Sequence, residues 1–102
     1  MFNGEGGDGS RPDGSTKLKA ATKRVIVRFA DGKVRTFDVS AYVSDSETYG
    51  NQTSLEVVNV DNGFTEAFDV RYDTRLRHDL SNFEEFVDQF IVDAYRMALH
   101  VI

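Results

Sequence analysis

The stretch RVIVRFADGKVRTFDV, residues 24–39, decides the first half of the fold. Apolar β-branched and aromatic residues alternate with polar ones on both sides of Asp31-Gly32, a pattern typical of two strands joined by a tight turn. The same pattern returns in LEVVNVD, residues 55–61, and FTEAFDVR, residues 64–71, which flank Asn62-Gly63. The sequence therefore predicts two β-hairpins, one after the other.

Two registers are open for the first hairpin. A two-residue turn would place Phe29 opposite Val34, whereas a bulged three-residue loop would place Arg24 opposite Asp38. We prefer the second register because it pairs opposite charges across the strands. It also gathers five apolar side chains on one face of the sheet, namely Val25, Val27, Phe29, Phe37 and Val39.

Two segments lack the apolar content of a packed core. Residues 1–22 are rich in glycine and basic side chains, and they predict a disordered tail, because too little apolar surface is present to offset the entropy of ordering. SDSETYGNQTS, residues 44–54, is almost wholly polar and predicts a solvated connection between the hairpins. Residues 23–102 then form a single α+β domain.

The C-terminal segment predicts a helix from Asn82 to Leu99. Ser81 and Glu84 fit a capping box, in which the two side chains satisfy free backbone N–H groups at the helix start. Apolar residues then recur at the three- and four-residue spacing of one helical face, at Phe83, Phe86, Val87, Phe90, Ile91, Ala94, Met97, Ala98 and Val101. The expected fold is α+β, with a four-stranded antiparallel sheet from two β-hairpins and one long C-terminal helix packed on one face (ββββα).

The end of this predicted helix is apolar on nearly every side. AYRMALHVI, residues 94–102, carries side chains such as Leu99 and Ile102 that one sheet face cannot all cover. Burying such a side chain is favourable by about 1.5–3 kcal/mol, so the surplus should find a partner surface. Either the connection at residues 71–80 or the N-terminal tail covers it, or it takes part in self-association or a partner groove.

Composition limits the compartment and the partners. The chain has 102 residues, no cysteine, no apolar run long enough for a membrane span and no signal-peptide pattern, so we expect a cytoplasmic protein without membrane contact. The net charge of −5 is uneven, since residues 45–102 hold four basic and twelve acidic side chains. An acidic half disfavours broad nucleic-acid binding and suits a basic protein partner. The candidate contacts on the polar helix face are Glu84, Glu85, Asp88 and Asp93.

No set of residues in the sequence predicts catalysis. A nucleophile with a base and an orienting group is missing, and so are a phosphate-binding glycine loop and a calcium loop, so we expect no enzyme activity, cofactor or metal. RYDTRLRH, residues 71–78, supplies an alternative. Its side chains could hold phosphates and stack bases of single-stranded nucleic acid, with help from the basic tail at residues 17–24. The residues of that alternative site are Arg71, Tyr72, Arg75 and Arg77.

The leading hypothesis is a small non-enzymatic protein-interaction module. We expect it to be an accessory or inhibitory protein of a bacterium or mobile element. Its partner is another protein or a second copy in a homodimer, bound by the acidic helix face or by Leu99 and Ile102.

Overall fold

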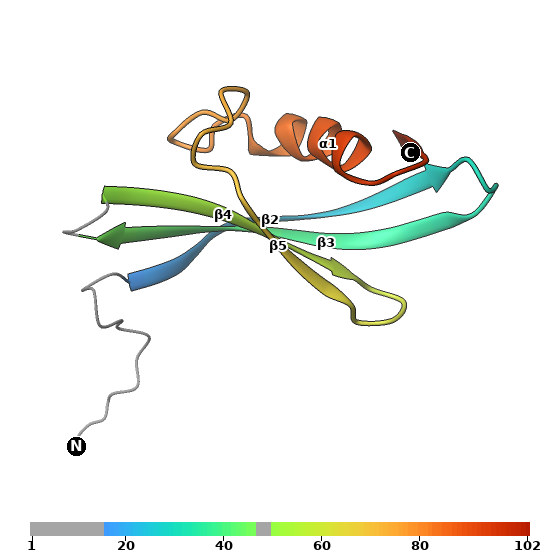
Figure 1. Ribbon diagram of the computed structural model, residues 1–102, viewed down its shortest axis with the longest axis horizontal. Coiled ribbons are helices and arrows are strands. Elements are labelled where there is room, and N and C mark those ends of the chain that lie inside the picture. The colour runs from blue at the N-terminus through green and yellow to red at the C-terminus, as the bar shows by residue number, and fades with distance from the viewer. Residues whose placement is uncertain (1–15, 47–49) are drawn as a thin grey trace, which may run out of the picture.

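The computed structural model describes residues 16–46 and 50–102 as an antiparallel sheet with one helix on one face (Figure 1). The sheet has five strands, one more than the sequence predicts. The elements are β2 (Thr16–Phe29), β3 (Val34–Ser46), β4 (Gly50–Asn59), β5 (Thr65–Asp69), α1 (Phe83–Ala94) and β6 (Ala98–Val101).

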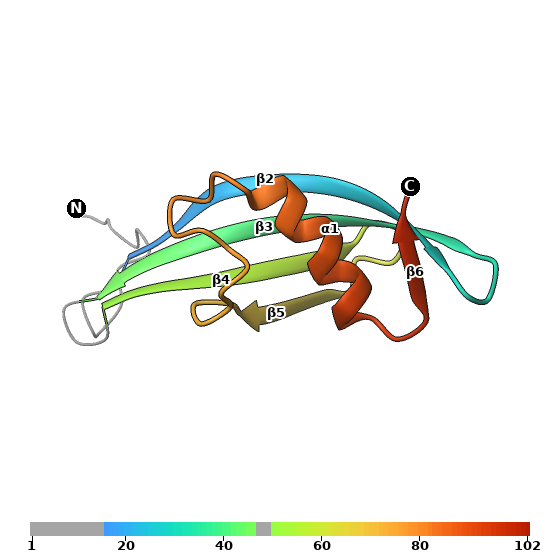
Figure 2. The same ribbon diagram turned by 90° about the horizontal axis from the view of Figure 1, so that it is seen from above.

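The strands lie in the order β5-β4-β3-β2-β6, and every neighbouring pair is antiparallel. The first four strands form a meander of chain neighbours, whereas β6 follows the helix and returns to the outer side of β2 (Figure 2). The molecule measures 52 × 30 × 19 Å. It is elongated along the strands and only two layers thick.

The preferred register of the first hairpin is confirmed. Val25 lies opposite Phe37, and Arg24 lies opposite Asp38. The guanidinium of Arg24 donates two hydrogen bonds to the Asp38 carboxylate, at 2.7 and 3.0 Å. Three residues form the loop, and its Gly32 has a φ of 83°, which an L-residue adopts only with strain. All five apolar residues that this register gathers are buried.

The core lies between the sheet and three successive segments that cover its face. The middle of the face is covered by α1, whose predicted apolar positions from Phe83 to Ile91 point to the sheet, whereas Ala94 is exposed. One end is covered by the connection between β5 and α1, through Val70 and Leu76, and the other by Tyr95. The buried helix residues are Phe83, Phe86, Val87, Phe90 and Ile91.

The strands are longer than the sequence predicts. β2 begins at Thr16, so residues 16–22 belong to a strand and not to the predicted tail, while the predicted disorder of residues 1–15 lies outside the described residues. The polar segment at 44–54 is not simply a connection, because β3 runs to Ser46 and β4 begins at Gly50. Pairing along a long hairpin satisfies the backbone polar groups there without apolar side chains.

The predicted helix was too long, and its predicted cap is absent. α1 has 12 residues and follows the N-cap Asn82, whose side chain makes no capping hydrogen bond. That side chain instead accepts from the Arg77 backbone N–H and donates to the Arg75 carbonyl, at 2.9 and 2.7 Å. The Ser81 backbone N–H donates to Asp79 and not to a box with Glu84. Within the described residues, no helix is long and apolar enough to cross a membrane.

The residues after the helix form strand β6. Tyr95 is already extended, with φ −107° and ψ 125°. Met97 has a φ of 69°, a left-handed conformation that costs a non-glycine residue about 1–2 kcal/mol. This turn sends the chain back along β2, so Leu99 and Ile102 were wrongly assigned to a helical end. In this strand Ala98 and Val101 pack against the core, and Leu99 and His100 between them are exposed. A spacing that looks apolar on every side of a helix is therefore divided between core and surface.

We predict a large difference between two leucine truncations. Leu55 is fully buried on β4, whereas the side chain of Leu18 on β2 is 62% exposed. Leu55→Ala should therefore lower the free energy of unfolding by about 2–5 kcal/mol, because it removes buried methyl groups and leaves a cavity. Leu18→Ala should change it by less than about 0.5 kcal/mol. Urea denaturation measures both values, and similar losses would contradict the core.

Candidate functional site

Four apolar side chains are exposed where β6 joins β2, and we call this region of the sheet edge, with both of its faces, the apolar end. They are Ile26, Met97, Leu99 and Ile102, and 52% of Leu99 and 64% of Ile102 are exposed. Two backbone hydrogen bonds of 2.8 Å hold the strand in place, from the Ile102 N–H to the Ile26 carbonyl and from the Ala30 N–H to the Met97 carbonyl. Neither the connection at 71–80 nor another described segment covers this surface.

The two edges of the sheet differ in charge. β6, at one edge, reads Ala-Leu-His-Val and has no acidic or basic residue apart from His100. β5, at the other edge, reads Thr-Glu-Ala-Phe-Asp and carries Glu66 and Asp69. Charged side chains on edge strands discourage pairing with another chain, so β6 is the less protected edge.

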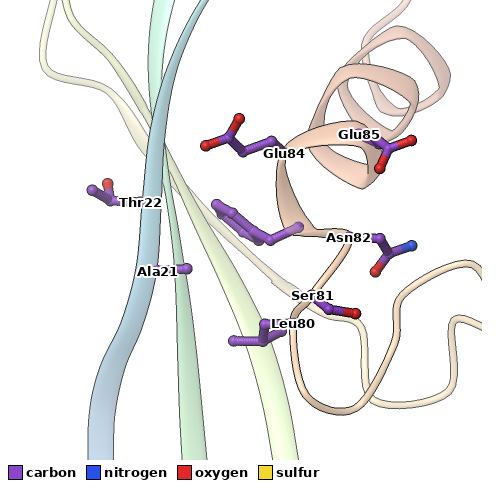
Figure 3. A pocket seen from close by; sticks show the side chains of 8 residues that line it. Ala21, Thr22, Leu80, Ser81, Asn82, Glu84 and Glu85 are labelled. Carbon is purple, nitrogen blue, oxygen red and sulfur yellow. The ribbon is translucent and has the colours of Figure 1, made fainter.

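The acidic helix residues do not form one free surface. Asp88 accepts from Lys23 Nζ at 2.8 Å, and Asp93 accepts from the Arg75 guanidinium at 2.5 Å. Glu84 and Glu85 are exposed, but they diverge at the helix start, with Glu84 on the side of β2 and Glu85 pointing away (Figure 3). A basic partner would have to displace two internal cations before it reached all four predicted carboxylates.

Figure 3 also shows a hollow beside these glutamates, at the N-terminal end of α1. Its volume is about 430 Å³. Its walls come from β2, through Ala21 and Thr22, and from the start of the helix with the residues before it, which are Leu80, Ser81, Asn82, Phe83, Glu84 and Glu85. Two glutamates at its rim oppose the binding of an anion by the helix dipole.

The predicted arginine-rich segment is divided by the fold. Arg75 lies against the helix, where its guanidinium donates to Asp73 at 3.0 and 2.8 Å and stands 5.5 Å from the Phe86 ring centroid. The hydrogen bond from Arg75 lowers the pKa of the Asp73 carboxyl below its usual value. Arg75, one of the four residues of the alternative nucleic-acid site, therefore joins the connection to α1 and is not available to phosphates.

The other three residues of that alternative site share one hollow. Arg71, Tyr72 and Arg77 line it together with His78, and its volume is about 470 Å³. The Arg71 guanidinium stacks 4.9 Å from the Tyr72 ring centroid. Arg71 Nε lies 3.2 Å from Asp69, but it is buried and forms no hydrogen bond.

The basic residues at 17–24 do not extend this hollow. Lys23 and Arg24 lie on β2 and hold Asp88 and Asp38, so two of the predicted phosphate contacts already have acidic partners. The side chain of Lys17 lies outside the described residues. Lys19 is exposed on the same strand. The nucleic-acid alternative therefore loses Lys23 and Arg24 in addition to Arg75.

Sequence reasoning missed an aromatic hollow on the helix side of the apolar end. Its volume is about 230 Å³. The Tyr95 ring stacks on Phe37 at 5.2 Å between centroids, and its hydroxyl donates to Glu66 at 2.9 Å. The lining residues are Phe29, Arg35, Phe37, Asn59, Phe64, Glu66 and Tyr95. No local signal could reveal it, because it forms only when the chain after α1 returns to the sheet.

Catalytic and metal-ligating groups do not converge in the part of the chain that the structure describes. No three His, Cys, Asp or Glu side chains there are grouped to hold a metal ion. His78 lies in the loop after β5, and His100 lies on β6 at the opposite end of the sheet.

The chain matches no protein-family model, no curated protein and no solved structure. The residues and their geometry are therefore the basis for any proposal about its function.

We predict that Tyr95 makes the protein sensitive to high pH. Burial and the Glu66 carboxylate raise the pKa of the Tyr95 phenol. Above pH 10 an unfolded chain would lose a proton that the folded chain keeps, so the free energy of unfolding should fall as pH rises. The loss should begin near pH 10, the usual pKa of tyrosine, and grow as the pH rises further.

Tyr95→Phe should lower the stability at pH 8 by about 1 kcal/mol, because it removes a hydrogen bond, and should lose less stability between pH 8 and 11. Tyr72→Phe is the matched control, since Tyr72 is 82% exposed. Urea denaturation at both pH values measures the difference. An equal loss in the wild type and both variants would refute the role of Tyr95.

Proposed function

We propose that this chain is a small protein-interaction module that binds through its apolar end and acts by association rather than catalysis. The observation that carries the proposal is the combination of exposed Leu99 and Ile102 with an edge strand that has no carboxylate, lysine or arginine and pairs with β2 alone among the described strands. Exposed apolar side chains beside an open strand edge are a feature of interaction sites.

The backbone supports the same surface. Met97 has a strained left-handed conformation, which brings the chain back along β2. A segment that extended into solvent after α1 would not need this strained conformation. The strand that results offers free N–H and C=O groups beside apolar side chains. Edges of this kind bind extended segments of other chains by adding a strand to the sheet.

A second candidate is contact with single-stranded nucleic acid by Arg71, Tyr72 and Arg77. It is favoured by the shared hollow and by the exposed Tyr72 ring stacked against a guanidinium. Base stacking on an aromatic ring beside basic groups is the usual basis of sequence-tolerant binding. It is the weaker candidate, because binding to phosphates needs many cations and this half of the chain is acidic.

We predict that two leucine-to-lysine variants differ in their binding to a partner. Leu99→Lys places a charge on the apolar end, whereas Leu18→Lys places one on a similarly exposed leucine at the other end of β2. The purified chain and an extract of the cells that make it are each passed over immobilised protein. Leu99→Lys should weaken retention about tenfold or more, since burial of one leucine is favourable by about 1.5–3 kcal/mol.

Leu18→Lys should retain the same proteins as the wild type. Circular dichroism checks that both variants are folded. If Leu99→Lys and Leu18→Lys retain the same proteins equally well, the apolar end is not the binding surface.

We also predict how two arginine variants in the hollow lined by Arg71, Tyr72 and Arg77 change the binding of nucleic acid. In a filter-binding titration at low salt, Arg71→Gln and Arg77→Gln should each weaken binding of a single-stranded oligonucleotide and lower its salt dependence by about one counterion. Arg28→Gln, at an exposed position of β2, is the control and should have little effect. No binding by the wild type at low salt would exclude this candidate.

A further inference from the structure

We propose that the partner of the apolar end is a second copy of the chain, whose β6 pairs antiparallel with β6 about a two-fold axis at His100. The proposal rests on the proposed function and adds the identity of the partner and the register of the contact. The resulting dimer has one continuous sheet, with the two β6 strands at its centre.

The direction of the backbone groups supports this register. The Ile102 N–H points to β2, where it donates to the Ile26 carbonyl. Because N–H groups alternate sides along an antiparallel strand, that of Val101 points outward and that of His100 points inward. The Leu99 carbonyl, opposed to the His100 N–H across a planar peptide, points outward as well. The pairing with β2 shifts register next to Leu99, so the alternation is counted only from His100 to Ile102. With the axis at His100, Leu99 of each copy lies opposite Val101 of the other. The Val101 N–H of each copy then donates to the Leu99 carbonyl of the other, which gives two main-chain hydrogen bonds.

Charge favours this edge over the other one. Residues 97–102 have no acidic, lysine or arginine side chain, so two copies of β6 meet without a like-charge pair other than the two imidazoles. A dimer through β5 would bring Glu66 and Asp69 of both copies into one short ladder, and neighbouring like charges destabilise such pairs. A second copy therefore fits β6 and is opposed at β5.

The exposed side chains are also self-complementary. Leu99 of each copy comes beside Val101 of the other, which extends the partly buried surface around Val101. A ladder of four residues is nevertheless much shorter than a standard interface of about 800 Å² per partner requires. We therefore expect a monomer–dimer equilibrium that depends on concentration.

Disulfide trapping tests the register, because the natural chain has no cysteine. Opposite Cα atoms at a non-hydrogen-bonded site are about 4.5 Å apart, within the range that a disulfide spans. Under mild oxidation, His100→Cys should form a covalent dimer about tenfold or more faster than Ala67→Cys, which puts the thiol at the centre of the opposite edge strand. Both positions are exposed. Non-reducing electrophoresis over time measures the two rates.

Adding Leu99→Lys to His100→Cys should slow cross-linking by a similar factor. Equal rates for His100→Cys and Ala67→Cys would overturn the paired strands. If Leu99 governs retention of another protein while His100→Cys does not cross-link, the proposed function stands and the second copy is excluded. If immobilised protein retains nothing through Leu99, the proposed function itself fails.

Discussion

The buried side chains between α1 and the sheet hold the rest of the structure in place, because the helix is much shorter than the strands that it covers. Twelve helical residues span about 18 Å, whereas the fourteen residues of β2 span about 46 Å. The helix therefore cannot cover the apolar face alone. The connection before it covers one end through Val70 and Leu76, and Tyr95 covers the other.

The three segments that cover the sheet are held in place by polar residues, which are then less available to a partner. Arg75 and Asn82 fasten the connection to the helix, through Asp73, Asp93 and the backbone on either side. Lys23 joins β2 to the helix through Asp88. Ion pairs at such exposed positions each contribute at most about 1 kcal/mol, so they orient segments that apolar packing has already brought together. The charges that the sequence offers to partners are thus partly used inside the molecule.

Local signals in the sequence were enough for the hairpins and, through the apolar spacing from Phe83 to Ile91, for the body of the helix, although its predicted cap is absent. The pairing of Arg24 with Asp38 distinguished the correct register from its rival. The end of the helix could not be predicted in this way, because Met97 and Val101 continue its apolar spacing although they lie beyond it. Their conformation depends on an open edge of β2, far away in the sequence, and so does the aromatic hollow around Tyr95. The exposure of Leu99 and Ile102 was foreseeable only as a surplus of apolar residues, not as a strand.

The return of β6 to β2 also sets an order of assembly during synthesis. Strands β2 to β5 pair with their chain neighbours, and such local contacts form early. The residues that cover their apolar face follow β5 in the sequence and are made after the four strands. During synthesis the four-stranded meander therefore leaves the ribosome with its apolar face exposed to water, until residues 83–101 emerge and cover it. Slow translation over that interval would lengthen the time in which the nascent chain depends on chaperones.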